Sequence, residues 1–185
     1  VPGTLGGALM MNAGAFGGEI SNYLKSIDIM KQTGRIYTIS PENLEFGYRY
    51  SSLNPDEFIL IARFELPKIS SEIIQEKRVK ASQGRKNSQP LRFRSSGSVF
   101  KNPGVNLAAG YLIDQAGLKG TCIGDAEIST KHANFFVNHG SAKATDIAKL
   151  IFLARKTVYE KYGVMLELEV STIGFCQSEL DPYAA

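Results

Sequence analysis

The clearest pattern of hydrophobic and polar positions lies over residues 145–162 and predicts a helix. Apolar residues recur there at the helical period, at Ile147, Leu150, Ile151, Ala154 and Val158. Thr145 is suited to cap the start of this helix, and Gly163 is suited to end it. This helix is the most secure element that the sequence predicts.

Alternating apolar and polar residues predict strands elsewhere in the chain. Residues 26–30 and 35–39 alternate on either side of Thr33-Gly34, which is typical of a β-hairpin. Residues 58–66 are rich in Ile, Phe and Leu and predict a buried strand. Residues 165–173 alternate between apolar and polar side chains, so we expect a half-buried strand there.

The remaining segments predict shorter or weaker elements. Six glycines in residues 1–18 are too many for a stable isolated helix, so we expect only a short helical piece around residues 8–12. The other expected elements are a charged helix over 70–88, a short helix over 107–118, two short strands within 120–138 and a frayed tail after Cys176. This mixture predicts an α+β protein of two units, with the boundary in the polar stretch 67–90.

Composition narrows the class of protein. The chain has 185 residues, 43% of them hydrophobic and 21% charged, which is typical of a globular protein. A net charge of +3 suits an anionic small molecule and is too weak to indicate nucleic acid as a partner. No apolar run reaches the length of a membrane span. The two cysteines and two histidines, Cys122, Cys176, His132 and His139, do not have metal-ligand spacing, so we expect no metal.

The start of the chain suggests a fragment. The sequence begins with Val1 and enters a glycine-rich loop at once, although such a loop normally follows an element that positions it. We therefore expect that an amino-terminal portion is missing.

Residues 97–103, Gly-Ser-Val-Phe-Lys-Asn-Pro, concentrate hydrogen-bonding side chains. Ser98, Lys101 and Asn102 offer a hydroxyl, an ammonium and a carboxamide in one loop, although an ordinary polar turn is an alternative. No Gly-x-Ser-x-Gly motif surrounds Ser98, so a serine hydrolase is not expected. A serine can nevertheless give a proton to a strongly basic carbon centre such as an enolate.

Three further features leave alternatives open. The glycines of residues 1–18 could let a large anion such as a cofactor pyrophosphate approach the backbone, or they could form a tight packing joint. Arg49, between Tyr48 and Tyr50, could bind a carboxylate with its planar fork, or it could be a surface arginine stacked on tyrosine. Glu169 could contribute to a site or be a solvated glutamate.

Taken in order, several stretches resemble one family. They are Pro2–Gly7, Asn12–Gly17, Phe46–Arg49, Gly97–Pro103, Leu112–Gly120, Gly124–Ala126, Lys131–Phe135 and Glu169-Val170. Together they resemble the UDP-N-acetylenolpyruvoylglucosamine reductase (MurB) family over nearly the whole chain. The Lys131-His132-Ala133-Asn134 stretch is most similar to the branch of that family with the more compact substrate domain.

The resemblance implies a fold and an activity. Residues 1–86 would be the C-terminal portion of a PCMH-type FAD-binding domain, residues 87–163 a small α+β substrate-binding domain, and residues 164–185 a closing strand and tail. The family uses NADPH and FAD to reduce UDP-N-acetylglucosamine enolpyruvate to UDP-N-acetylmuramate in peptidoglycan synthesis. The resemblance also implies a cytoplasmic protein that needs no membrane, nucleic acid or obligate protein partner.

The resemblance also assigns roles to residues. Ser98 matches the proton donor of the family, and Arg49 and Glu169 match its charge stabilisers. The matching cofactor-binding residues are Gly3, Thr4, Gly6, Gly7, Asn12 and Gly14, and the candidates for substrate binding are Tyr48, Lys101 and Asn102. The alternatives are a non-catalytic or inactive fragment and another flavin oxidoreductase of the same fold.

Overall fold

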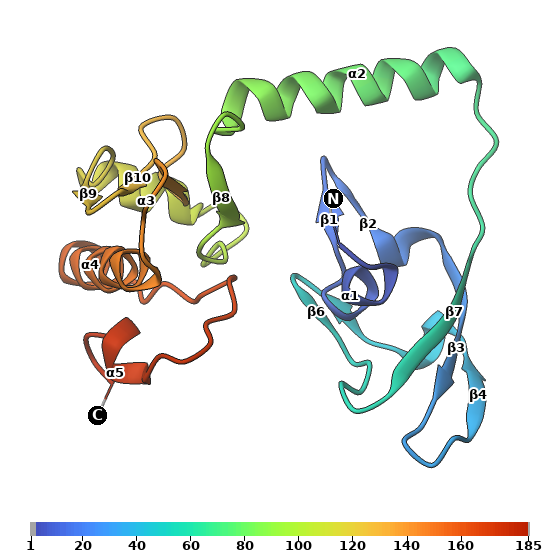
Figure 1. Ribbon diagram of the computed structural model, residues 1–185. Coiled ribbons are helices and arrows are strands. Elements are labelled where there is room, and N and C mark those ends of the chain that lie inside the picture. Colours follow the sequence, from blue (N-terminus) through green and yellow to red (C-terminus); the bar gives the residue numbers. More distant parts are fainter. Residues whose placement is uncertain (1–2, 185) are drawn as a thin grey trace. The chain divides into compact units, whose positions relative to one another are not determined.

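The computed structural model describes residues 3–184, which form two compact units (Figure 1). The first unit ends at Arg78 and the second begins at Val79. Pro2, which opens the glycine-rich motif, lies outside the described residues. The two units are described separately below.

From Gly3 to Arg78, the first unit contains the helix α1, two 3₁₀ turns, three small antiparallel sheets and the first part of a second helix. In chain order its elements are α1 (Leu5–Met10), β1 (Gly14–Ala15), β2 (Gly18–Glu19), η1 (Ile20–Tyr23), β3 (Leu24–Met30), β4 (Ile36–Ile39), η2 (Pro41–Asn43), β5 (Phe46–Gly47), β6 (Tyr50–Ser51) and β7 (Phe58–Phe64). The largest sheet has the strand order β4-β3-β7, and β1 pairs with β2 and β5 with β6. The short helix predicted around residues 8–12 therefore begins earlier, at Leu5.

The predicted hairpin is confirmed by the pairing of β3 with β4. Ile27 pairs with Ile39 and Met30 with Ile36, and Gly34 in the turn has a φ of 81°, a conformation that glycine adopts without strain. Ile27 and Ile29 are buried and join the small core of this unit with Leu9, Leu24 and Leu53.

The strand expected at 58–66 exists as β7, but the prediction that it is buried was wrong. β7 lies at the edge of its sheet, and Phe58, Leu60 and Ile61 are 58%, 46% and 50% exposed. Arg63 ties β7 to β3 through two hydrogen bonds to the Asp28 carboxylate, at 2.9 and 2.8 Å. These bonds, with one from Thr38, lower the pKa of Asp28 to about 2.

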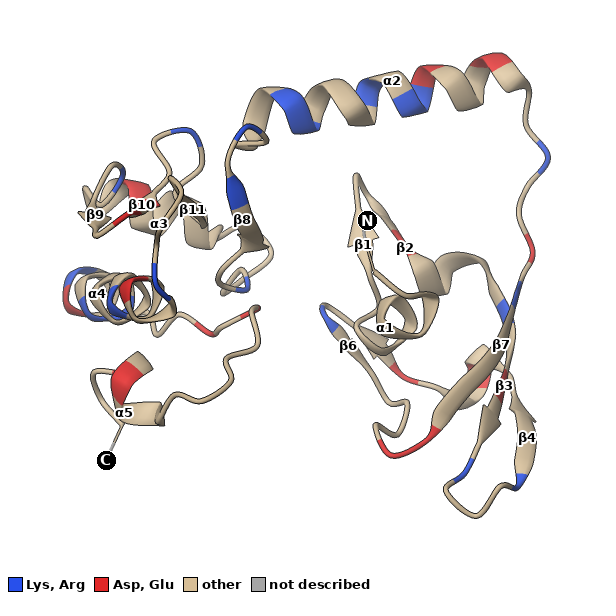
Figure 2. Cartoon of the chain, viewed as in Figure 1, with Lys and Arg blue, Asp and Glu red and all other residues tan. Residues whose placement is uncertain are grey.

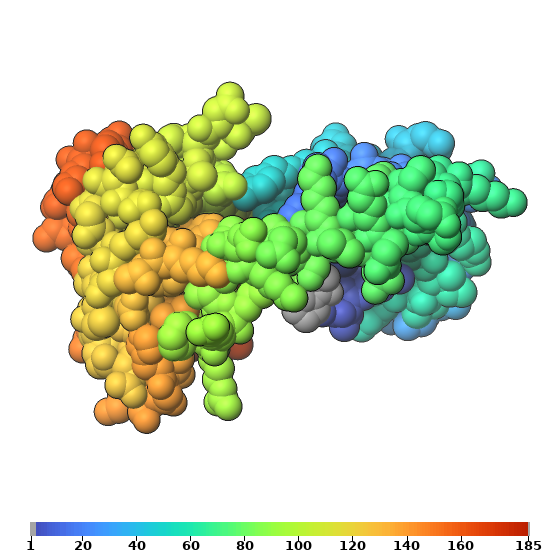
Figure 3. Space-filling view, turned by 90° about the horizontal axis from the view of Figure 1, so that it is seen from above, coloured from blue at the N-terminus to red at the C-terminus, as the bar shows by residue number. Residues whose placement is uncertain are grey.

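A long charged helix contains the boundary between the units. This helix, α2 (Ser71–Ser88), matches the prediction, and none of its residues, all of which are described, is buried. Its side chains project from the surface in Figure 3. Its acidic residues, Glu72 and Glu76, lie near its start, and its basic residues follow from Lys77 onward, as Figure 2 shows.

The second unit is an antiparallel sheet packed against helices. Its elements are β8 (Arg94–Ser98), α3 (Ala109–Gln115), β9 (Cys122–Ile123), β10 (Ala126–Ile128), β11 (Phe135–Asn138), α4 (Ala144–Tyr162) and α5 (Gln177–Leu180). The strand order is β8-β11-β10-β9, and α4 packs against β9 and β10. The core combines the apolar face of α4, including Leu150, Ile151 and Val158, with Ile113 of α3 and Phe100. The α+β class expected from the sequence is confirmed.

The two ends of α4 are capped in different ways. Gly163 ends the helix as predicted, with a φ of 67° and an N–H bond to the Tyr159 carbonyl. Thr145 was wrongly expected to cap the start, because the helix already begins at Ala144. The Asp146 carboxylate instead accepts a hydrogen bond from the Lys143 backbone N–H at 2.9 Å.

Three other expectations differ from the structure. Residues 120–138 contain three short strands instead of two. The strand expected at 165–173 is reduced to one isolated bridge, between Leu168 and Phe100. The tail after Cys176 contains α5, whose Leu180 is buried in the core, so its C-terminal part is packed where fraying was expected.

Candidate functional site

Ser98 lies at the end of β8, where the chain leaves the sheet. Ser98 pairs with Phe135 of β11, and Gly97 before it has a φ of 84°, which lets the strand change direction. Val99 and Phe100 follow and are almost completely buried, at 2% and 1% exposure. Ser98 itself is only partly buried, so its side chain lies next to the surface, directly before two buried residues.

The segment after Ser98 pairs with the segment that contains Glu169. The Glu169 N–H donates to the Val99 carbonyl at 2.8 Å, and the Lys101 N–H donates to the Glu167 carbonyl at 2.8 Å. Between these bonds, Phe100 and Leu168 form an antiparallel bridge. Ser98 and Glu169, which are 71 positions apart in the numbering, are thus both bonded directly to Val99, one through the chain and one through a hydrogen bond.

Lys101 and Asn102 continue from the same segment. The Lys101 ammonium forms an ion pair with Glu167, and the Asn102 Oδ1 accepts a hydrogen bond from the Ala109 N–H at 3.1 Å, at the start of α3. Asn102 therefore fixes the loop between β8 and α3. Substrate binding by either residue stays a prediction.

Arg49 lies in the tight hairpin between β5 and β6. Its φ is 56°, in the left-handed region that residues with a Cβ rarely adopt. Its guanidinium carbon lies 5.0 Å from the centre of the Tyr48 ring, and Tyr48 is 49% exposed. The stacking of Arg49 on tyrosine, which the sequence left as one alternative, is therefore present. The contact with the Tyr48 ring also restricts where the guanidinium can lie. Backbone strain of this kind clusters at functional sites.

The three candidate catalytic residues come from both units. Ser98 and Glu169 share the second unit, where the backbone of each is bonded to Val99, whereas Arg49 belongs to the first unit. That all three side chains meet around one substrate stays a prediction.

Of the two roles that the sequence left open for the glycine-rich segment, the packing joint is present at Gly14, and cofactor contact stays a prediction. Gly14 is a packing joint, because a Cβ there would lie 2.9 Å from the Gly18 carbonyl oxygen. Gly3 has a φ of 145°, and a Cβ placed on Gly3 or Gly6 would have open space beyond the adjoining backbone, with no other atom of the described residues within 4 Å. At these two positions the segment presents bare backbone that a large ligand can approach, which fits the pyrophosphate of a dinucleotide cofactor.

Thr4 and Gly7 shape the turn that follows. The Gly7 N–H donates to the Thr4 Oγ1 at 3.1 Å, so Thr4 caps α1. A Cβ on Gly7 would lie 3.2 Å from this oxygen, a tight contact that would require the Thr4 side chain to shift slightly.

Asn12 is buried and binds other parts of the first unit. It is 1% exposed, and its Nδ2 donates to the Glu19 carboxylate at 2.8 Å and to the Gly47 carbonyl at 3.1 Å. Gly47 belongs to the hairpin that carries Arg49. Asn12 thus connects the glycine-rich segment to that hairpin, which makes an indirect role in cofactor binding the better prediction.

Asn134 and His132 have structural roles that the sequence did not predict. Asn134 is 3% exposed and hydrogen-bonds the backbone of Phe100, while the His132 Nδ1 accepts a hydrogen bond from the Asn134 N–H at 3.2 Å. Burial lowers the pKa of His132, and the nearby charge of Lys119 adds to this effect. The sequence did contain one signal for this role, since Asn134 directly precedes the apolar run 135–137. A polar residue beside a buried strand is itself apt to be buried, and it then needs hydrogen-bond partners.

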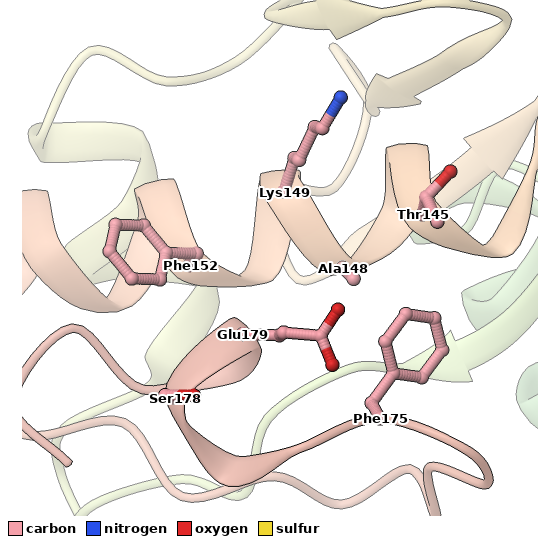
Figure 4. Close-up of a pocket in the computed structure, with 7 residues that line it drawn as sticks. All are labelled: Thr145, Ala148, Lys149, Phe152, Phe175, Ser178 and Glu179. Atoms are coloured by element: carbon pink, nitrogen blue, oxygen red, sulfur yellow. The ribbon is translucent and has the colours of Figure 1, made fainter.

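Other features of the described residues contribute little to this site. Residues 3–184 hold no cluster of three His, Cys, Asp or Glu side chains that could bind a metal, and their helices include none that is long and apolar enough to span a membrane. A pocket of about 330 Å³ lies between α4 and the α5 region and is lined by Lys149, Phe152, Phe175 and Glu179, among others (Figure 4). It includes none of the candidate residues.

The comparisons with known proteins decide the family. Residues 89–173 match the family described as UDP-N-acetylenolpyruvoylglucosamine reductase, C-terminal domain. This part of the chain belongs to the UDP-N-acetylenolpyruvoylglucosamine reductase family. The family expected from the sequence is therefore confirmed.

Relatives and a solved structure extend the similarity beyond that domain. The chain is 45% identical over 175 residues to the UDP-N-acetylenolpyruvoylglucosamine reductase of Clostridioides difficile, covering 94% of this chain and 57% of that protein. The UDP-N-acetylenolpyruvoylglucosamine reductase 2 of Bacillus cereus is 47% identical, with the same coverage. The crystal structure of MurB from Thermus caldophilus matches with a TM-score of 0.79 and 39% identity, over 92% of this chain and 60% of that one.

This chain corresponds to only part of each of these relatives. The chain spans between half and two thirds of the length of these relatives. With 94% of this chain matched, the similarity extends into both units, and the candidate site residues are distributed over the two.

Proposed function

We propose that this chain is part of an NADPH-dependent flavoenzyme that reduces UDP-N-acetylglucosamine enolpyruvate to UDP-N-acetylmuramate for peptidoglycan synthesis. The family of residues 89–173 and the names of the relatives support this reaction. The observation that carries the proposal is the backbone pairing of the Ser98 and Glu169 segments, which bonds both residues to Val99. A role in the cytoplasm and in cell shape follows from the same proposal.

The exposed glycine backbone at Gly3 and Gly6 fits the phosphate groups of FAD. FAD, when bound, would take a hydride from NADPH, leaving NADP⁺, and would supply that hydride to the methylene carbon of the enolpyruvyl group. Gly3, Thr4, Gly6 and Gly7 would hold the cofactor, with Asn12 and Gly14 maintaining their arrangement.

The residues of this chain would then stabilise the negative charge that develops on the substrate and donate a proton to it. As the carbon–carbon double bond accepts hydride at one end, its electron pair moves to the other carbon and the attached carboxylate. The Ser98 Oγ gives its proton to that carbon, and the resulting alkoxide regains a proton from solvent. A preorganised donor at such a developing charge lowers a barrier by about 3–4 kcal/mol.

Arg49 and Glu169 would stabilise the charge that develops on the carboxylate. The Arg49 fork can bind both carboxylate oxygens at once. Glu169 would do so by donating a proton or through a positively charged partner, since an ionised carboxylate would repel the substrate. Tyr48, Lys101 and Asn102 are proposed to hold the nucleotide sugar.

The test separates the two halves of the reaction in the full-length enzyme. Without oxygen, NADPH should bleach the flavin, and the enolpyruvyl nucleotide sugar should restore its colour. For Ser98→Ala we expect bleaching at a near-normal rate and a loss of about 100-fold or more in the rate at which colour returns. If both rates are unchanged, Ser98 is not the proton donor.

The same assay tests the alternatives. Rapid reoxidation by another alkene or by an alcohol-derived substrate, and not by the enolpyruvyl compound, would indicate a different flavin oxidoreductase of this fold. A full-length protein that binds no flavin would indicate a non-catalytic relative.

A further inference from the structure

Asn134 connects two residues of the proposed site through the backbone between them. Its side chain forms two hydrogen bonds to one residue: the Phe100 N–H donates to the Asn134 Oδ1 at 2.9 Å, and the Asn134 Nδ2 donates to the Phe100 carbonyl at 2.8 Å. Its backbone carbonyl accepts a third bond, from the Val99 N–H at 2.8 Å. All three bonds fix the two residues that follow Ser98.

The position of Asn134 in the sheet explains why a side chain is needed. Phe135 pairs with Ser98 at the end of the ladder between β8 and β11, just after a register shift between Phe135 and Val137. Beyond Ser98 the regular ladder ends, and the carboxamide of Asn134 takes the place of a peptide group for Phe100. A carboxamide can do this because, like a peptide group, it holds an N–H donor and a carbonyl acceptor in one plane.

The segment from Val99 to Lys101 is also hydrogen-bonded to a second stretch of chain, through the two residues on either side of Leu168. Val99 accepts from the Glu169 N–H at 2.8 Å, and Lys101 donates to the Glu167 carbonyl at 2.8 Å. Val99 and Phe100 are therefore held from one side by Asn134 and from the other by the Glu169 segment. A displacement of Phe100 would move Ser98 relative to Glu169.

We infer that Asn134 is a positioning residue that fixes the Ser98 hydroxyl relative to the Glu169 carboxyl. This inference rests on the proposed function, in which Ser98 gives the proton. It assigns Asn134 no contact with the substrate. Its bonds are buried, since Asn134 and Phe100 are 3% and 1% exposed, so water cannot easily replace them.

The decisive variant is Asn134→Asp in the full-length enzyme. The shape is preserved and Oδ1 can still accept from Phe100, but an ionised carboxylate faces the Phe100 carbonyl without a proton to donate. We expect substrate-driven flavin reoxidation to slow by about 10- to 100-fold, because small displacements of a reacting group have effects of this size. Flavin reduction by NADPH and the dissociation constant of the nucleotide sugar should change less than about twofold. A slowing of both half-reactions by the same factor would overturn the inference.

A double variant asks whether Asn134 acts through Ser98. If it does, adding Asn134→Asp to Ser98→Ala causes no further loss, because the group that it positions is already absent. Multiplied losses would mean that Asn134 acts on something other than Ser98. This comparison also separates the two proposals: if Ser98→Ala is harmless the proposed function fails, and if only Asn134→Asp is harmless this inference alone fails.

A pH profile and a matched control complete the test. At low pH the introduced carboxyl group is protonated and can donate to Phe100 again, so the reoxidation defect of Asn134→Asp should shrink as pH falls, whereas Ser98→Ala should show no such recovery. Asn138→Asp is the control: Asn138 is also in β11, and its Oδ1 only accepts, from Gly140 and Ala142 at 2.7 and 3.1 Å. An aspartate preserves both bonds, so this variant should match the wild type.

A second variant keeps the inference testable if Asn134→Asp does not fold. Asn134→Ser is smaller and lacks the paired donor and acceptor, so it should show the same selective loss in reoxidation. Hydrogen exchange at the Phe100 amide should also become faster, which is a readout independent of activity. Unchanged exchange together with unchanged reoxidation would contradict the inference.

Discussion

At the scale of single residues, the most informative position is Arg49, which combines a strained backbone with a proposed catalytic role. A φ of 56° costs a residue with a Cβ about 1–2 kcal/mol, whereas glycine adopts it freely. The hairpin therefore holds arginine at some expense of stability.

Arg49→Gly should consequently separate stability from activity. We expect the free energy of unfolding to stay equal or rise by up to about 1 kcal/mol, while turnover is lost. Arg49→Lys should fold normally and lose at least about tenfold in turnover, because an ammonium cannot copy the two-pronged fork. Chemical denaturation and steady-state rates of the full-length enzyme check both points. The control Arg35→Gly should lose about 0.5–1 kcal/mol, and an equal loss in Arg49→Gly would mean that no strain is relieved.

His132 predicts how stability depends on pH. Its pKa is lowered from 6.5 in the folded protein, so the folded state resists protonation of a ring whose Nδ1 must accept the Asn134 N–H. The contribution to stability is complete above pH 6.5 and is lost as pH falls below that value, until the folded-state pKa is passed. Denaturation between about pH 5 and 7.5 should show this loss, and His132→Gln should show less of it. Equal slopes in the two proteins would contradict the assignment.

The residues of the site were only partly predictable from the sequence. Ordered motifs pointed to Ser98, Glu169 and Arg49, and the structure pairs the backbone segments that carry the first two. The role of Asn134 was not predictable, because its bonds to Phe100 join positions 34 apart at the point where a strand pairing ends. Asn12 was assigned to the cofactor because of its motif, whereas its burial and its bond to Gly47 are visible only in the fold.

At the scale of elements, α4 and the β3–β4 hairpin were predictable because their signals are local. The helical period of Ile147 to Val158 and the turn at Thr33-Gly34 are properties of neighbouring residues. The alternation in 165–173 was misleading, because only the part around Leu168 finds a partner, the short segment at Phe100. The exposure of β7 was unpredictable for a similar reason, since an edge position depends on the arrangement of distant strands.

The end of α4 allows a direct test at this scale. Gly163→Ala should lower the free energy of unfolding by about 1–2 kcal/mol, because the φ of 67° is strained for alanine. Thermal or chemical denaturation measures this difference. Gly104→Ala is the control, since its Cβ would meet Leu107 at an ordinary 3.8 Å, and it should be nearly neutral. If the two variants lose the same stability, the conformation of Gly163 is not what ends the helix.

At the scale of the whole molecule, each unit has its own core. Within residues 3–184, the larger core runs from Val99 to Leu180 and takes no residue from the first unit, whose small core runs from Leu9 to Leu53. A separate core is the usual condition for independent folding.

We therefore expect residues 79–185 to fold when they are expressed alone. Circular dichroism should show one cooperative thermal transition, and Leu150→Ala should lower its midpoint, because removing a fully buried leucine costs about 2–5 kcal/mol. This fragment should not reoxidise reduced flavin, because Arg49 and the glycine-rich segment lie in the first unit. A fragment without a cooperative transition would show that the first unit is needed for folding.

The central claim is that Arg49, Ser98 and Glu169 act on one substrate group. A crystal structure of the full-length enzyme with FAD and the enolpyruvyl nucleotide sugar tests it most directly. We predict that the Ser98 Oγ lies within about 3.5 Å of the carbon that is protonated, and that the Arg49 guanidinium and the Glu169 carboxyl lie within about 3 Å of the substrate carboxylate. A substrate bound with the Ser98 hydroxyl or the Arg49 guanidinium turned away from the enolpyruvyl group would contradict the account.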